Sequence, residues 1–184
     1  MSESWQQACD AWRIYSEEMA ALSRHLDPAT WAALMAELRG CKGKIVVTGV
    51  GTSGIAARKI AHMLACVERP AIYLNATDAA HGDLGFVGPD DLVIMLSRGG
   101  NSEELTRLLP GLAMKDTPIL CVTENPASAI ALASRLVIST GVQREIDPLN
   151  MLATTSIVLV LAIFDAACAC LMSESGYSKE TLLA

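Results

Sequence analysis

The chain has 184 residues, a length that suits one domain with a sizeable hydrophobic core. Hydrophobic residues make up 52% of it and charged residues 18%, so it is more apolar than an average soluble domain. Burial between subunits would account for the excess. The net charge of -6 and the lack of any Lys/Arg-rich stretch argue against nucleic acid as a partner, because binding to a phosphate backbone needs clustered cations.

Cysteine spacing and apolar segments indicate the compartment. The six cysteines stand at positions 9, 41, 66, 121, 168 and 170, without the paired spacing of a zinc site. The first seven residues lack the basic and apolar regions of a secretion signal. The apolar stretch 157–172 is shorter than the roughly 20 residues that a membrane span needs, and Asp165 in its middle would be costly in lipid. We therefore expect a cytoplasmic protein with no membrane partner, in which this stretch is a helix buried in protein.

Two helices are predicted at the N-terminus. Apolar side chains recur at steps of three and four over residues 3–25, which is the spacing of one helix face. Asp27 and Pro28 are typical of a cap and a first helical position, so we expect a second helix from there to about Leu38, ending at Gly40.

From residue 44 onward, short apolar runs alternate with helical stretches. The runs are 44–49, 71–74, 91–96, 118–123 and 135–139. Helical stretches of about 10 to 14 residues separate most of them, and a long last helix is expected over about 150–174. Such alternation predicts an α/β fold with a parallel sheet covered on both faces and ligands at the carboxyl ends of the strands. No linker or repeat interrupts it, so we expect residues 43–184 to form a single domain, with the helical pair of residues 1–42 packed on it.

Two glycine-rich turns follow the first and third apolar runs, and each opens an expected helix. The first is Gly-Val-Gly-Thr-Ser-Gly at 49–54, and the second is Ser-Arg-Gly-Gly-Asn-Ser at 97–102. A helix start presents unpaired amide hydrogens and a partial positive charge, and glycine lets the backbone approach an anion closely. Hydroxyl groups add further donors, from Thr52, Ser53, Ser97 and Ser102. The two turns together predict one divided anion cradle with phosphate as its guest; for either turn alone, ordinary loop chemistry is an equal alternative.

The first turn also spells Gly-x-Gly-x-x-Gly, the dinucleotide fingerprint, but the sequence does not favour a nucleotide cofactor. That fingerprint calls for an acidic residue at the end of the next strand, where Asn75 stands, and it gives the second turn no role. A P-loop is excluded because no Gly-Lys-Ser/Thr follows at the required spacing. The three histidines are scattered and lack metal-ligand spacing, so no metal is expected either.

Three further stretches join these turns: Ala-Ala-His-Gly-Asp-Leu-Gly at 79–85, Val-Thr-Glu-Asn-Pro at 122–126, and Glu-Ile-Asp-Pro-Leu at 145–149, leading to Thr-Thr-Ser at 154–156. With them the chain resembles the sugar isomerase (SIS) domain family, most closely its arabinose-5-phosphate isomerase branch, over about residues 42–180. The resemblance implies a flavodoxin-like, three-layer α/β/α fold with a five-stranded parallel sheet. It also implies a homodimer or homotetramer that binds phosphosugars where subunits meet, without a cofactor. Many members of this branch carry a pair of CBS modules after the sugar domain, for which this chain has no room.

By this resemblance, the two turns and the last of these stretches would hold the substrate. The residues implied are Gly51, Thr52, Ser53, Ser97, Gly99, Gly100, Asn101, Ser102, Thr154, Thr155 and Ser156. The chain departs from the family in three places: Thr52 stands where a lysine is usual, Asn101 stands where a glutamate is usual, and the chain ends before a typical His-Pro-Gly-Gly segment. Arg58 and Lys59 either add positive potential at the first turn or form a solvated helix face.

Aldose-ketose isomerisation moves a proton between neighbouring carbons through an enediol, so it needs a base and a group that stabilises the developing oxyanion. Glu145 is the expected base, because it matches the family's Glu-x-x-Pro-Leu and because an apolar pocket would raise its pKa toward the working pH. The alternative is a helix-start carboxylate or a surface ion pair with Arg144. His81 would assist ring opening or proton shuttling, since imidazole titrates near neutral pH; the alternative is a structural histidine held by Asp83 or a backbone carbonyl.

The leading hypothesis is an isomerase that interconverts ribulose 5-phosphate and arabinose 5-phosphate. Two alternatives stay open. Thr52 and Asn101 supply neither a positive charge nor a base, which suggests a phosphosugar-sensing module that binds its ligand without turnover. The other alternative is an isomerase of a different phosphosugar, such as a hexulose or heptulose phosphate.

Overall fold

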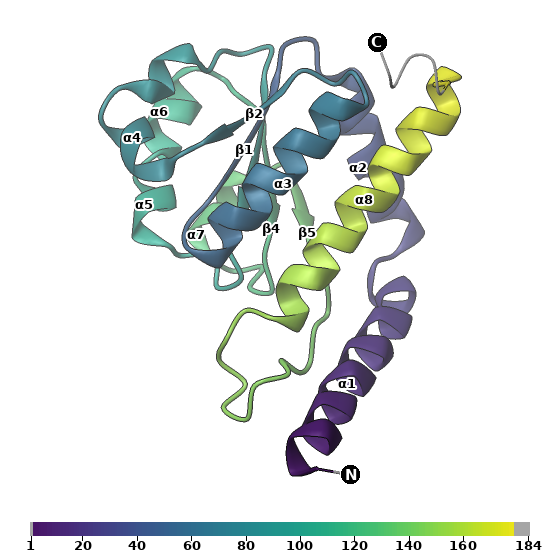
Figure 1. The fold of residues 1–184 in the computed structure, drawn as a ribbon. Helices are drawn as coiled ribbons and strands as arrows, with labels where there is room; N and C mark the ends of the chain where they lie inside the picture. Colours follow the sequence, from purple (N-terminus) through teal and green to yellow (C-terminus); the bar gives the residue numbers. More distant parts are fainter. Residues whose placement is uncertain (1, 179–184) are drawn as a thin grey trace.

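The computed structural model describes residues 2–178, and Figure 1 shows their arrangement. Two helices come first, α1 (Glu3–His25) and α2 (Pro28–Gly40). The alternating part consists of β1 (Ile45–Gly49), α3 (Thr52–Cys66), β2 (Ala71–Leu74), α4 (Ala76–Ala80), the 3-10 helix η1 (Asp83–Phe86), β3 (Leu92–Leu96), α5 (Glu103–Thr106), α6 (Leu109–Met114), β4 (Ile119–Val122), α7 (Ala129–Ala133), β5 (Leu136–Ile138) and α8 (Thr155–Ser175).

The strands form the predicted five-stranded parallel sheet, in the order β2-β1-β3-β4-β5. Side chains alternate between its two faces, as the period of a strand requires: Val47 and Ile94 face one core, while Val46 and Val93 face the other. Helices α2, α3 and α8 cover the first face, and α4 to α7 cover the second (Figure 1). Both faces are therefore dry, which explains why the strands are continuous apolar runs.

The N-terminal helices begin where the sequence predicts. The Ser2 hydroxyl accepts a hydrogen bond from the Trp5 amide, and the Asp27 carboxylate accepts bonds from two amides at the start of α2. Helix α2 packs on the sheet with two fully buried leucines, whereas α1 packs mainly along α8 and its first half extends past the body of the domain (Figure 1). Trp5 and Trp12 on α1 are 49% and 55% exposed.

Some expected helices are shorter than the sequence suggests. The second face is covered by helices of four to six residues rather than 10 to 14, with Pro110 and Gly111 in the middle of one of these segments. The last helix begins at Thr155 rather than near residue 150. The carboxylate of Asp147 accepts amide hydrogens from Leu149, Met151 and Leu152, and this turn holds the chain out of a helix just before α8.

Helix α8 has 21 residues, so it is longer than the apolar stretch that the sequence suggests. By length and composition alone, it could cross a membrane, with a mean hydropathy of 2.3 over its best window. Half of that window is buried within the domain, where Phe164 is fully enclosed by the core. Asp165 forms an ion pair with Lys59 of α3. These contacts make α8 one of the packed outer helices of the first face.

Candidate functional site

The two glycine turns lie side by side at the carboxyl edge of the sheet. Strands β1 and β3 are neighbours in the sheet, and Gly49 at the end of one pairs with Leu96 at the end of the other. The strand order changes direction here, since β2 lies on one side of β1 and β3 on the other. Such a switch point is where open α/β sheets bind ligands. The prediction that both turns face one site is consistent with this geometry.

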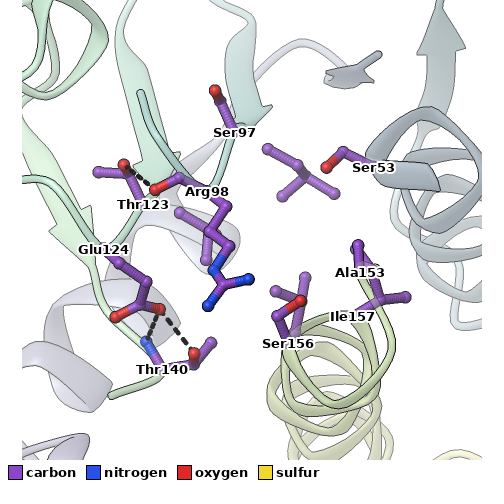
Figure 2. Close-up of a pocket in the computed structure, with 12 residues that line it drawn as sticks. Ser53, Ser97, Arg98, Thr123, Glu124, Thr140, Ala153, Ser156 and Ile157 are labelled. Carbon is purple, nitrogen blue, oxygen red and sulfur yellow. Dashed lines mark hydrogen bonds between the residues drawn. The ribbon is translucent and has the colours of Figure 1, made fainter. Parts of the chain in front are cut away.

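The first turn needs its glycines. Gly51 has φ +58° and ψ -129°, a backbone conformation that residues other than glycine rarely adopt. A Cβ on Gly54 would lie 2.8 Å from the Gly49 carbonyl oxygen, so the start of α3 packs directly on the end of β1. This close packing places Ser53 in the first turn of α3, facing the gap between the turns (Figure 2).

The second turn is closed by hydrogen bonds of its own. The Ser97 and Ser102 hydroxyls lie 2.9 Å apart, and the Gly100 amide donates to Ser97 Oγ at 3.1 Å. Gly100 has φ +68°, and a Cβ there would overlap the Ser128 hydroxyl. The Asn101 side chain accepts a bond from the Ala129 amide at 3.0 Å and donates to the Gly99 carbonyl at 3.3 Å. Asn101 therefore shapes the turn itself.

A narrow hollow of about 30 Å³ opens between the two turns and the start of α8 (Figure 2). Ser53, Ser97 and Ser156 line it, so the structure brings together three of the predicted substrate residues. The hydroxyl of Ser156 is buried and has no hydrogen-bond partner among the residues that the structure describes. The other lining residues are Leu96, Arg98, Val122, Thr123, Glu124, Thr140, Ala153, Ile157 and Val160.

Two charged residues of this hollow have no role in the sequence analysis. Arg98 lies inside the second turn, and Glu124 lies inside the stretch 122–126, so both belong to motifs already quoted. The Glu124 carboxylate is saturated by donors: the Thr140 amide at 2.8 Å, the Thr140 hydroxyl at 2.6 Å, the Gly141 amide at 3.2 Å and the Ser139 hydroxyl. It ties the end of β5 to the end of β4.

Glu145 is buried behind the hollow and serves as a cap for α8. Its Oε2 accepts hydrogen bonds from the Thr154 amide at 2.9 Å, the Thr154 hydroxyl at 2.9 Å and the Ser156 amide at 3.1 Å. Its Oε1 accepts one bond, at 2.8 Å from Arg98 Nη1. The Glu145 side chain is 0% exposed, whereas that of Arg98 is 41% exposed. The carboxylate thus occupies the positive end of a long helix.

This environment reverses the expected pKa shift of Glu145. Burial opposes the charged form and would raise the pKa, but the dipoles of Ser156 and Thr154 outweigh it and hold the pKa below its usual value. The expectation of a raised pKa in an apolar pocket is therefore wrong, because the pocket wall around this carboxylate is made of hydrogen-bond donors. The helix-start alternative describes its position, but the ion-pair partner is Arg98 rather than Arg144.

Comparison with known proteins decides the family. Residues 37–170 match the family model described as the SIS domain. The chain belongs to the SIS domain family. Its curated relatives include arabinose 5-phosphate isomerase KdsD of Shigella flexneri, 39% identical over 140 residues, and arabinose 5-phosphate isomerase GutQ of Escherichia coli (strain K12), 36% identical over 140 residues. Each match covers 76% of this chain, but only 43% of KdsD and 44% of GutQ, so the chain spans less than half the length of these relatives.

Two solved structures superpose on nearly the whole of this SIS domain chain. One, from Listeria monocytogenes str. 4b F2365, carries a provisional assignment as a sugar-phosphate isomerase; it has a TM-score of 0.94 and 38% identity, and the match covers 99% of this chain and 96% of that one. The other is an E. coli CFT073 protein in complex with arabinose 5-phosphate, with a TM-score of 0.92, 29% identity, and coverage of 99% of this chain and 97% of that one. The family and the fold predicted from the residues are confirmed.

Several residues that the SIS resemblance implies do not line the hollow in this chain. The amide and the hydroxyl of Thr154 both donate hydrogen bonds to Glu145. Thr155 is fully buried, and its hydroxyl has no hydrogen-bond partner among the described residues. His81 is exposed at the C-terminal end of α4, and among the described residues its ring has no hydrogen-bond partner, Asp83 included. The substrate roles of these residues, and of Gly51, Thr52, Gly99 and Gly100 at the turns, stay predictions.

The remaining charges near the first turn are engaged elsewhere. The Arg58 guanidinium lies 4.6 Å from the centroid of the Tyr73 ring, and Lys59 pairs with Asp165. Over residues 2–178, no group of three His, Cys, Asp or Glu side chains is arranged to hold a metal ion. The hollow therefore offers hydroxyl groups, the Glu124 carboxylate, and the Arg98 guanidinium with Glu145 behind it.

Proposed function

We propose that this SIS domain chain is a sugar-phosphate isomerase that interconverts D-ribulose 5-phosphate and D-arabinose 5-phosphate through an enediol. The observation that carries the proposal is the hollow at the ends of β1 and β3, which three serines line together with an arginine that pairs with a buried carboxylate. Relatives named arabinose 5-phosphate isomerase, and a structure in complex with arabinose 5-phosphate, support the choice of substrate. The proposal includes a cytoplasmic homodimer or homotetramer.

The phosphate group would lie against the two glycine turns. The start of α3, a helix of 15 residues, offers unpaired amide hydrogens and a positive field. Ser53 and Ser97 both line the hollow, and the Ser102 hydroxyl contacts that of Ser97. Because these donors do not titrate near neutral pH, they would hold a phosphate over a wide pH range.

The proton transfer would use Glu145. Its Oε1 carries a single hydrogen bond, which leaves a lone pair for a proton. In the ketose-to-aldose direction, the C1–H bond breaks, the proton passes to Oε1, and the bonding pair forms the enediolate double bond while the carbonyl pair moves to oxygen. The proton returns at C2, and the hydroxyl proton moves from the oxygen on C1 to the oxygen on C2. The two sugars therefore have the same atomic composition.

His81 would assist the hydroxyl step from another copy of the chain. On its own chain it lies just after the last residue of α4, outside the hollow. An assembly with sites where subunits meet would bring an exposed imidazole of one copy to the hollow of the next. Under this proposal, His81→Gln lowers kcat without changing the stability of the isolated chain.

The direct test is turnover of ribulose 5-phosphate by the purified protein, with the aldose followed by NMR. We expect the same equilibrium mixture from either pentose phosphate, and a higher KM in Ser53→Ala and Ser97→Ala. Ser173→Ala is the matched control, because it removes a hydroxyl from the exposed end of α8. Six- and seven-carbon ketose phosphates are run in parallel, and faster turnover of one of them would replace the proposed substrate.

A second candidate function is a phosphosugar-binding module without turnover. It is favoured by Asn101, whose amide serves the turn where the family has a carboxylate, and by the low pKa of Glu145, which makes it a weak base. Thermal stabilisation by sugar phosphates, together with no exchange of the C1 or C2 proton with solvent, would favour this function over the isomerase.

A further inference from the structure

Among the residues that the structure describes, Arg98 is the one cationic side chain that lines the hollow. The cations on α3 face other groups, since Arg58 stacks on Tyr73 and Lys59 pairs with Asp165. Thr52, at the position where the family has a lysine, offers a hydroxyl only. Any positive side-chain charge that meets a substrate in this hollow therefore comes from Arg98.

One nitrogen of the Arg98 guanidinium is held by Glu145, and the side chain is partly exposed. Nη1 is held 2.8 Å from Oε1 of Glu145, whose carboxylate is anchored to the first turn of α8. A guanidinium has five N–H donors in a rigid fork, and no hydrogen bond of Nε or Nη2 to residues 2–178 accompanies the Nη1 bond. With 41% of the side chain exposed, these donors are available to a ligand.

The guanidinium reaches a different part of the hollow from the glycine turns. Figure 2 shows Ser53 and Ser97 at one end of the view and the Arg98 guanidinium beside Ser156 at the other. In a pentose 5-phosphate, the phosphate and the carbonyl group sit at opposite ends of the carbon chain. A substrate with its phosphate against the turns would present its carbonyl end to Arg98.

We propose that Arg98 is a catalytic residue of the isomerisation: Nε and Nη2 bind the carbonyl oxygen and the enediolate oxyanion that develops on it, while Glu145, the proposed base, also holds Nη1 and so positions the guanidinium. The inference rests on the proposed function and deepens it. A charged donor that is in place before the substrate arrives stabilises an oxyanion without reorganisation. Ser156 lines the same hollow. Arg98 thereby supplies the cation that Thr52 lacks.

The test compares Arg98→Gln, Arg98→Lys and the wild type. Removing one oxyanion donor lowers kcat by about 100-fold, so we expect a loss of this size in Arg98→Gln and a smaller loss in Arg98→Lys. KM and the affinity for inorganic phosphate change by less than about 3-fold, because the phosphate contacts are untouched. Added guanidinium ion restores part of the kcat of Arg98→Gln. Arg107→Gln is the matched control, since it breaks an exposed arginine-glutamate pair on α5 and keeps kcat unchanged.

Arg98→Lys covers the case in which the glutamine variant does not fold, because lysine retains a charge opposite Glu145. Unchanged kcat in a folded Arg98 variant, or a loss confined to phosphate affinity, would overturn the inference. A hydroxamate of a four-carbon sugar acid phosphate, which mimics the enediolate, separates this failure from failure of the proposed function. If the wild type shows no turnover, the isomerase proposal fails together with the catalytic role of Arg98, but binding of the oxyanion by Arg98 is still tested separately. The hydroxamate titration then tests whether Arg98 binds the oxyanion. If Arg98→Lys binds the hydroxamate 10-fold more weakly than the wild type, a difference of about 1.4 kcal/mol, the result supports that binding. Equal affinity in the two proteins overturns it.

Discussion

Two buried carboxylates, each paired with a cation, stand at opposite edges of the sheet. At the amino edge, Asp91 accepts hydrogen bonds from the Lys44 amide at 2.8 Å, from Lys44 Nζ at 2.6 Å and from the Gly88 amide at 2.8 Å. At the carboxyl edge, Glu145 accepts three bonds from the start of α8 and one from Arg98. The side chains of Asp91 and Glu145 are 6% and 0% exposed. Both carboxylates therefore organise backbone that enters the sheet or leaves it.

The two pairs differ in what their cations have left to donate. Lys44 Nζ also donates to the Phe86 carbonyl at 2.8 Å and lies 5.4 Å from the Phe86 ring centroid, so Phe86 engages it as well as Asp91. Arg98 gives one nitrogen to Glu145 and turns the rest of its fork toward a hollow lined by hydroxyls. The Lys44–Asp91 pair is thus bound mainly to other groups of the protein at the amino edge. The Arg98–Glu145 pair leaves charged N–H donors exposed at the carboxyl edge. The following predictions test this contrast.

The largest effect is expected for Glu145→Gln. Glutamine weakens the charge-assisted hydrogen bonds from Thr154, Ser156 and Arg98, and since such bonds contribute roughly 2 kcal/mol each, we expect a loss of about 3 kcal/mol of unfolding free energy. The variant also releases Arg98 and the start of α8, so turnover should fall at least as far as in Arg98→Gln. Urea unfolding at fixed protein concentration and kcat at saturating ribulose 5-phosphate measure the two losses. Loss of stability with full kcat would reduce Glu145 to a structural cap.

A smaller and purely structural effect is expected for Asp91→Asn. The amide cannot accept all three bonds with the same strength, and hydrogen bonds to charged groups contribute about 2 kcal/mol, so the unfolding free energy should fall by roughly that amount. Lys44 is 34% exposed, which lets water take over part of its solvation. Because the amino edge does not meet the substrate, kcat of the folded fraction should match that of the wild type. A kcat loss equal to that of Glu145→Gln would remove the contrast between the two edges.

The sequence predicts the strands and glycine turns of the carboxyl edge better than it predicts the Arg98–Glu145 ion pair at that edge. Strand positions follow from apolar runs, and the two turns follow from glycines whose positive φ angles, at Gly51 and Gly100, no other residue adopts easily. Two of the predicted hydroxyl residues, Ser53 and Ser97, line one hollow for the same reason, since parallel neighbouring strands end at one edge. These are consequences of local pattern and topology.

The Arg98–Glu145 pair joins residues 47 apart, and no local pattern predicts it. It depends on the path of the loop before α8, which turns at Asp147 and brings Thr154 back to the Glu145 carboxylate. The same loop decides the direction of the pKa shift. The apolar pocket expected from the sequence would raise the pKa of Glu145, but amides and hydroxyls of the folded chain surround the carboxylate and lower it. The late start of α8 has the same origin.

The smallest predicted effect is on acid stability. Burial alone would raise the pKa of both carboxyls, but donors from Ser156 and Thr154 at Glu145, and from Lys44 and Gly88 at Asp91, hold each pKa below its ordinary value of 4.5 or 3.8. The unfolded chain therefore binds more protons than the folded one in the acid range, and the stability that each group contributes is complete above its ordinary pKa. It is lost as the pH falls through the lower, folded value.

We expect the urea midpoint of the wild type to fall below about pH 4.5, first through Glu145 and then, below about pH 3.8, through Asp91. Glu145→Gln should begin to lose stability at a lower pH than Asp91→Asn. Of the two carboxyls, Glu145→Gln retains only Asp91, whose ordinary pKa is the lower one. Each variant thus serves as the control for the other, in titrations from pH 7 to pH 3 at one protein concentration. Identical acid profiles for the two variants would mean that neither pair governs acid unfolding, and the resemblance between the two edges of the sheet would then be geometric only.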